Sequence, residues 1–222
     1  ATLTLFFTAT GRRGDTGQSF EQRLFQASAR VTQAGDVLTT HDWTPCAESF
    51  AADGVDYVIV NRAVGTPGFI KAFRDPFHFR DPNDGRDYIL FSGSLAKADH
   101  AFNGCVGLAR AEGAGFTDWR ILPPLVGAAG VNNEMERAMM RVVDGRYYLF
   151  WSTQAKTFAP EVTTGPTGLY GMVADNLFGP YQPLNGHGLV AANPVEEPEQ
   201  TYSWWVCHDL TAIGFVNHWG MN

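Results

Sequence analysis

The chain has 222 residues, of which 45% are hydrophobic and 18% charged, and its formal net charge is −7. This apolar fraction excludes a disordered chain, because it is large enough for a folded core. No apolar run approaches the roughly 18 residues that span a membrane, and no cluster of Lys and Arg indicates a nucleic-acid site. We therefore expect a globular domain with neither nucleic-acid nor membrane partners.

Short β-strands joined by turns are predicted along the whole chain, because 24 Gly and 12 Pro residues are spread through it. The first strand is predicted over residues 3–9. Residues 24–31 alternate as a strand does, although the composition of 18–30 would permit a helix. An Asp-Gly turn, which is the strongest short hairpin signal, is then followed by an aromatic strand in three places. These copies are residues 53–60, 84–91 and 144–150.

Each aromatic strand precedes a strand of small residues and an aromatic closing segment. The small-residue strands are expected at 105–111 and 168–173, and the closing segments at 119–124 and 178–184. A four-stranded unit of about 60 residues is typical of a β-propeller blade, with a β-sandwich as the structural alternative. The chain then holds about three to four blades, whereas a propeller must close on itself to cover its edges.

Cys46, Cys105 and Cys207 are too few and too widely spaced for a disulfide-rich scaffold. We expect three buried small hydrophobic residues. One disulfide with one free thiol stays open as the alternative.

The first segment that could carry chemistry is Phe73-Arg74-Asp75-Pro76. Arg74 would keep Asp75 ionised, and Pro76 would end strand pairing. Asp75 could then lie at a strand end and face a pocket. A structural Arg–Asp pair in a turn is the alternative, and residues 81–85 are interpreted as a plain hairpin turn.

The second segment contains Glu134 and Glu136, whose period-two spacing would put both on one face of a strand. Two like charges side by side raise one pKa, which keeps a carboxyl group protonated as a general acid. Arg137 would point to the other face of a regular strand but could turn inward at a strand end. The alternative is an exposed edge with two glutamates, and the apolar flanks argue against it.

Two separated carboxyl groups in an aromatic-rich chain favour glycoside chemistry. No Gly-rich phosphate loop and no Gly-x-Ser-x-Gly elbow is present in the sequence. The six histidines show no metal-ligand spacing. We therefore expect neither a cofactor nor a metal.

Several of these segments occur in an order that resembles glycoside hydrolase family 68, the levansucrase, inulosucrase and bacterial fructosidase group. The resemblance covers nearly the whole chain. It implies an all-β, five-bladed β-propeller with a central acidic pocket, which cleaves sucrose with retention and transfers the fructosyl group to water, a sugar or a fructan. The matching segments are residues 73–76 with 81–85, 121–125 with 130–132 and 136–137, 157–159, 165–171, and 200–203.

The resemblance also implies roles for individual residues. Asp75 corresponds to the transition-state stabiliser and Glu136 to the acid/base. Gln154 lies where many members carry His or Arg, at a position tied to acceptor handling. The remaining residues expected to bind sucrose are Arg74, Glu134, Arg137 and Tyr202.

The calcium ligands of Gram-positive members are not evident in the sequence. Phe69 and Asn133 stand where acidic ligands would be expected. The resemblance therefore implies no calcium, and a variant of the Gram-negative or actinobacterial kind.

The nucleophile of the family is an Asp in a Trp-Asp segment of the first blade, and no matching segment is present. His41-Asp42-Trp43 has the letters reversed and lies in the wrong place, so Asp42 is interpreted as structural. The chain also begins at Ala1 and ends soon after an apolar run. We expect residues 1–222 to be a partial catalytic propeller, inactive alone on sucrose and completed by an N-terminal chain or segment.

The main functional prediction is a secreted or periplasmic fructosyltransferase of the levansucrase type, with sucrose and fructan or sugar acceptors as partners. A β-fructofuranosidase that mainly hydrolyses sucrose is the alternative within the same fold. A non-catalytic sugar-binding propeller fragment is the alternative from another class.

Overall fold

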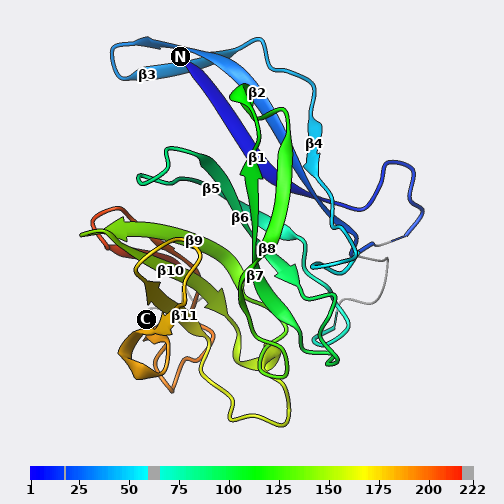
Figure 1. Cartoon of the computed structure of the whole chain (residues 1–222), viewed down its shortest axis with the longest axis vertical. Helices are drawn as coiled ribbons and strands as arrows, with labels where there is room; N and C mark the ends of the chain where they lie inside the picture. The colour runs from blue at the N-terminus through cyan, green and yellow to red at the C-terminus, as the bar shows by residue number, and fades with distance from the viewer. Residues whose placement is uncertain (18, 60–65, 217–222) are drawn as a thin grey trace, which may run out of the picture.

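The computed structural model describes residues 1–17, 19–59 and 66–216. These residues form fifteen β-strands and three one-turn 3-10 helices. The strands make four antiparallel sheets that follow one another along the chain, and Figure 1 shows them side by side. Within the same residues, no helix is both long and apolar enough to cross a membrane.

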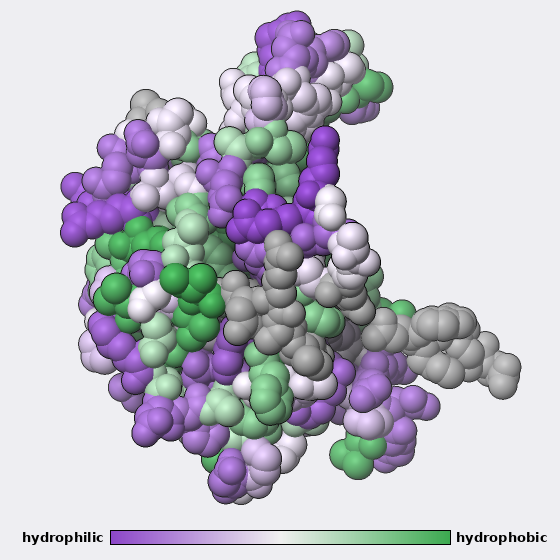
Figure 2. Space-filling model, turned by 90° about the vertical axis from the view of Figure 1, so that its right-hand side faces the viewer, coloured by the Kyte–Doolittle hydropathy of each residue, from purple (hydrophilic) through white to green (hydrophobic). Residues whose placement is uncertain are grey.

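The first sheet is built on the long strand β2, which pairs with β1 along one edge and with β3 and then β4 along the other. In the described part of the chain, β1 has no partner on its second edge. The β2–β3 hairpin projects at the top of the molecule in Figures 1 and 2, and the face shown in Figure 2 mixes polar and apolar residues. The strands are β1 (Thr2–Thr10), β2 (Gln22–Ala34), β3 (Val37–His41) and β4 (Ala47–Phe50).

The second and third sheets are meanders in which each strand pairs with the next, apart from the irregular outer edge of the third. The second contains β5 (Arg74–Arg80), β6 (Asp87–Ser94), β7 (Gly104–Ala111) and β8 (Trp119–Gly127). The third contains β9 (Glu136–Val143), β10 (Arg146–Thr153), β11 (Gly168–Ala174), β12 (Gln182–Pro183) and β13 (Leu189–Ala192). The 3-10 helices are η1 (Ala114–Phe116), η2 (Ala155–Thr157) and η3 (Leu184–Gly186).

The last sheet pairs β14 (Thr201–Val206) with β15 (Ala212–Val216). The first strands of these three sheets, β5, β9 and β14, lie next to one another, and β1 packs against β5. The second, third and last sheets are therefore propeller blades whose first strand is innermost. The first sheet is a blade in which β1 takes the place of a second strand, because β1 packs against β5 as β6 packs against β9. The fold prediction is confirmed: the chain supplies two four- or five-stranded blades, one without an inner strand in the described residues, and the start of another.

A shared core joins the two central blades. Tyr88, Leu90 and Leu108 from the second sheet pack in one cluster with Met140 and Leu149 from the third. All five are at most 1% exposed. Burial of this apolar surface holds the inner strands β5 and β9 in fixed relation.

The first Asp-Gly copy, residues 53–60, does not form the predicted hairpin strand. Asp53 Oδ1 instead accepts hydrogen bonds from three following backbone N–H groups, at 2.9–3.0 Å. Tyr57 is fully buried, and its hydroxyl donates to the carbonyl of Leu122 at 2.7 Å. The prediction is wrong because this segment is a side-chain-capped turn that anchors Tyr57 against the next blade; Val60 lies outside the described residues.

The three cysteines are all free, and they differ in burial. Cys105 is buried and Cys207 is half-buried, but Cys46 is exposed. The expectation of three buried residues is wrong for Cys46, which lies just before the short edge strand β4.

Gly104 should be intolerant of a side chain. A Cβ there would lie 2.7 Å from the backbone carbonyl of Asn133. We expect Gly104→Ala to lower the free energy of unfolding by about 1–3 kcal/mol, the usual cost of overpacking, measured by urea unfolding. Gly113→Ala is the matched control, because a Cβ there meets nothing within 4 Å. Equal midpoints for the two variants would contradict the close approach.

Candidate active site

A β-bulge near the start of each inner strand shapes the site. In β5, β9 and β14, two residues oppose one on the neighbouring strand. The first bulge residue has a positive φ in every case: 59° at Asp75, 54° at Arg137 and 59° at Ser203. None of them is a glycine, and such strained backbone clusters at functional sites.

The residues directly before the three bulges meet at one place. Arg74 Nη2 donates to Glu136 Oε1 at 2.7 Å, and the Tyr202 hydroxyl donates to Glu136 Oε2. The same position in three successive blades therefore contributes a cation, a carboxylate and a phenol to one site.

Arg74 is the centre of this cluster. Its Nη2 also donates to Glu134 Oε2 at 2.7 Å, its Nη1 donates to Gln22 Oε1 at 3.2 Å, and its Nε lies 3.6 Å from Asp75 Oδ2. The side chains of Arg74, Glu134 and Glu136 are 11%, 9% and 13% exposed. An exposed edge with two glutamates is therefore excluded, and three carboxylates surround one guanidinium.

Burial raises the pKa of Glu134, and the neighbouring charge of Glu136 adds to this effect while Arg74 opposes it. Burial by itself would lower the pKa of Arg74, but the charges of Glu134, Glu136 and Asp75 outweigh it and raise that pKa. The guanidinium therefore stays charged, and Glu134 is a group that can hold a proton at higher pH than an ordinary glutamate.

Asp75 is held from two neighbouring blades. Ser92 Oγ donates to Asp75 Oδ2 at 3.0 Å, and the Arg137 N–H donates to the same oxygen at 3.2 Å. The Asp75 N–H donates to Thr8 Oγ1 at 2.9 Å. Ser92 and Thr8 were not among the site residues expected from the sequence, although small polar residues at the ends of the aromatic strands are a signal that could have indicated them.

Gln154 lies on the outer side of Glu136, and its Nε2 donates to Glu136 Oε2 at 3.4 Å. Beside it is a recess of about 140 Å³. Arg137 itself is exposed and takes part in the cluster through its backbone. The recess is lined by Gln154, Ala155, Lys156, Thr167, Glu199 and Tyr202.

Asp42 is remote from this cluster in the fold. It follows β3 in the first sheet, and its exposed carboxylate pairs with Arg30 at 2.9 Å. This placement agrees with a structural residue.

Close to Phe69 in the sequence, the side-chain ammonium group of Lys71 is hydrogen-bonded to three oxygen atoms. Lys71 Nζ donates to the carbonyls of Gly68 and Ala101 and to Asn103 Oδ1, at 2.6–3.0 Å. Asn133 donates to the carbonyl of Ile70. Within the described ranges, no group of three or more His, Cys, Asp or Glu is arranged so that it could hold a metal ion. The expected lack of calcium stays a prediction.

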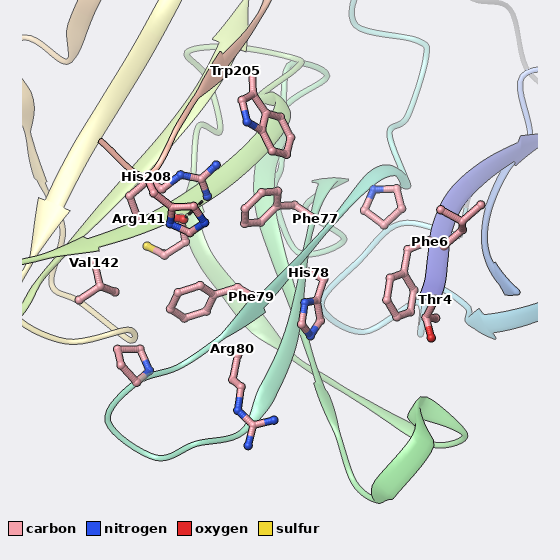
Figure 3. A pocket seen from close by; sticks show the side chains of 14 residues that line it. Thr4, Phe6, Phe77, His78, Phe79, Arg80, Arg141, Val142, Trp205 and His208 are labelled. Carbon is pink, nitrogen blue, oxygen red and sulfur yellow. Dashed lines mark hydrogen bonds between the residues drawn. The ribbon is translucent and has the colours of Figure 1, made fainter. Parts of the chain in front are cut away.

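A cavity of about 630 Å³ lies elsewhere. Its lining comes from the later parts of β5, β9 and β14 together with β1, and it carries no carboxylate. Figure 3 shows Phe77, Trp205 and Arg141 on one side of it and Phe6 on the other. The Arg141 guanidinium lies over the Phe77 and Trp205 rings, at 5.1 and 5.4 Å. The carboxylates that acid/base chemistry would need therefore lie at the Arg74 cluster and not in the lining of this cavity.

Several known proteins are similar to this chain in sequence. The family described as Levansucrase/Invertase matches residues 97–219. A levansucrase from Pseudomonas syringae pv. actinidiae is 42% identical over 211 residues, covering 85% of this chain and 48% of that protein. A levansucrase from Erwinia amylovora is 41% identical over 191 residues, covering 76% and 45%. The chain thus spans about half the length of the curated relatives it matches.

Solved structures of two proteins are similar to this chain in fold. An inulosucrase from Halalkalicoccus jeotgali bound to kestose is 40% identical, with a TM-score of 0.83 over 92% of this chain and 52% of that one. The catalytic domain of a β-fructofuranosidase from Microbacterium saccharophilum is 26% identical, with a TM-score of 0.79 over 97% and 53%.

The raised pKa of Glu134 predicts a dependence of stability on pH. The folded chain keeps this proton at a pH where the unfolded chain, with its ordinary value of 4.5, has lost it, so the stabilisation present below that pH is lost as pH rises. Relative to Glu134→Gln, the parent should become less stable from about pH 4.5 upward, as measured by urea unfolding. A stability difference between the parent and Glu134→Gln that stays constant with pH would contradict this.

Proposed function

This chain belongs to glycoside hydrolase family 68, the levansucrase and invertase family, and we propose that it supplies the acid/base and the transition-state stabiliser of a sucrose-cleaving, retaining fructosyltransferase. The observation that carries the proposal is the half-buried cluster in which Arg74, Glu136 and Asp75 come together from adjacent blades. Its levansucrase relatives at 41–42% identity support the same reaction class.

In this proposal Glu136 protonates the glycosidic oxygen as glucose leaves, and then takes a proton from the acceptor. Arg74 and Tyr202 bond to different oxygens of its carboxylate, which fixes its orientation. Asp75 stabilises the positive charge that develops on the fructosyl ring. Glu134 shares Arg74 with Glu136 and would contact a ring hydroxyl.

The acceptor side of the proposed site is the recess beside Gln154. A neutral amide can donate to and accept from a sugar hydroxyl but brings no charge. In this proposal, exposed Arg137 binds sugar at the rim of the site. Fructan, another sugar or water would then receive the fructosyl group, and a mainly hydrolytic enzyme is the second candidate because a β-fructofuranosidase shares the fold.

The family's nucleophile is proposed to come from a segment outside residues 1–222. Two observations support this: relatives are about twice as long, and β1 pairs along only one edge in the described residues. An N-terminal segment that contributes an inner strand would cover that edge and bring the nucleophile to the axis. We propose a secreted or periplasmic location for the complete protein, as expected for an enzyme acting on sucrose outside the cytoplasm.

Replacing the proposed acid/base should mainly slow the chemistry. In the complete protein, we expect Glu136→Gln to lower turnover of sucrose by at least about 100-fold, the usual value of general acid help, measured as glucose release. The loss should be smaller with a fructoside whose leaving group needs no protonation. A near-parental rate on sucrose, or an equal loss on both substrates, would remove Glu136 from this role.

Residues 1–222 alone should not turn over sucrose. A retaining mechanism needs a carboxylate nucleophile opposite the acid/base, and the two proposed carboxylates leave that position unfilled. The test is to compare glucose release by the isolated 24.3 kDa chain, confirmed by intact mass, with that of the complete protein. Clear turnover by a soluble monomer of this mass would overturn the missing-nucleophile argument, and Asp42 would be the first carboxylate to re-examine.

A further inference from the structure

At three junctions between successive blades in the described residues, a side-chain hydroxyl of one blade is hydrogen-bonded to the backbone of the next. In every case it stands at the end of the aromatic second strand of one blade and accepts an N–H from the bulge in the inner strand of the next. The pairs are Thr8 with Asp75 at 2.9 Å, Ser92 with Arg137 at 3.2 Å and Ser152 with Trp204 at 3.2 Å.

The register shows why these hydroxyls are near the site. Ser92 is the cross-strand partner of Arg74, and Ser152 is the partner of Glu136. Each of these two serines thus lies behind a site residue of its own blade while its hydroxyl binds the bulge of the next. A bulge residue with positive φ is strained unless its surroundings hold it in place. A hydrogen bond from its own backbone N–H supplies such a constraint at Asp75 and Arg137; in the third bulge the N–H belongs to Trp204, the residue after Ser203.

Ser92 differs from the other two because it also binds a carboxylate. Its hydroxyl accepts from the Arg137 N–H and donates to Asp75 Oδ2 at 3.0 Å, and Ser92 is fully buried. Arg137 directly follows Glu136, so one hydroxyl connects the carboxylate of Asp75 to the peptide that carries Glu136. We propose that Ser92 is a positioning residue that sets the separation of these two carboxylates; this rests on the roles given to them above.

Ser94 offers a matched comparison. It lies two residues along the same strand, is also fully buried, and accepts the Ala72 N–H at 3.0 Å. Its hydroxyl contacts neither Asp75 nor the β9 bulge. Ser94→Ala removes one buried hydrogen bond, whereas Ser92→Ala removes two, one of which goes to a carboxylate of the site. Asp75 then keeps the Arg137 N–H and the neighbouring Arg74 as contacts.

The experiment compares Ser92→Ala, Ser94→Ala and Ser92→Thr in the complete protein. We expect Ser92→Ala to lower kcat on sucrose about 10- to 100-fold with little change in KM, because small displacements of reacting groups cost this much. Ser94→Ala should stay within about threefold of the parent, and its urea midpoint should fall no further than that of Ser92→Ala, which loses one more hydrogen bond. Ser92→Thr should restore most of the activity, since Thr8 makes the same N–H contact at the first junction.

Equal kcat for Ser92→Ala and Ser94→Ala, or no restoration by Ser92→Thr, would overturn the positioning role. A parent protein that releases no glucose from sucrose would instead reject the proposed function. Crystal structures of parent and Ser92→Ala then decide the inference: a rotated Asp75 carboxylate supports it, and an unmoved one overturns it.

Discussion

The guanidinium of Arg74 lies between the carboxylates of Glu134 and Glu136, at 2.7 Å from each. Two carboxylates in a half-buried place repel each other and lose hydration, so they share a site only if a cation or a proton compensates. Arg74 comes from β5 and both glutamates from the start of β9 and the turn before it. The same contact therefore offsets part of the negative charge of these carboxylates and links two blades at their inner edge.

The bulges explain why this site lies at the start of the inner strands. Each one turns the chain through a positive φ and aims the residue before it toward the axis, at Arg74, Glu136 and Tyr202. A regular strand would send alternate side chains to opposite faces and could not place the Asp75 carboxylate and the Arg137 N–H against each other. The strain is offset by hydrogen bonds from the neighbouring blade, so the site depends on the order of the blades as well as on its own residues.

Local signals predicted much of this fold. The aromatic runs after Asp84-Gly85 and Asp144-Gly145 are β6 and β10. Glu134 and Glu136 reach one guanidinium, but not as members of one strand, because β9 begins only at Glu136. Asp53-Gly54 has the same letters but forms a capped turn, because the contacts of Tyr57 with the next blade decide its conformation. The support of Asp75 could not be predicted: Thr8 lies 67 residues before it, and no glycine marks the bulge.

The proposed mechanism requires sucrose to bind at the Arg74 cluster. A crystal structure of the complete Asp75→Asn protein with sucrose tests this requirement directly. This variant keeps the hydrogen-bonding shape of the site while losing the charge that matters most in the transition state, so bound sugar should survive. We expect the fructosyl unit to lie within hydrogen-bond distance, about 3 Å, of Glu136 and Arg74. Sucrose bound instead in the cavity beside Phe77 and Trp205, with no sugar at the cluster, would contradict it.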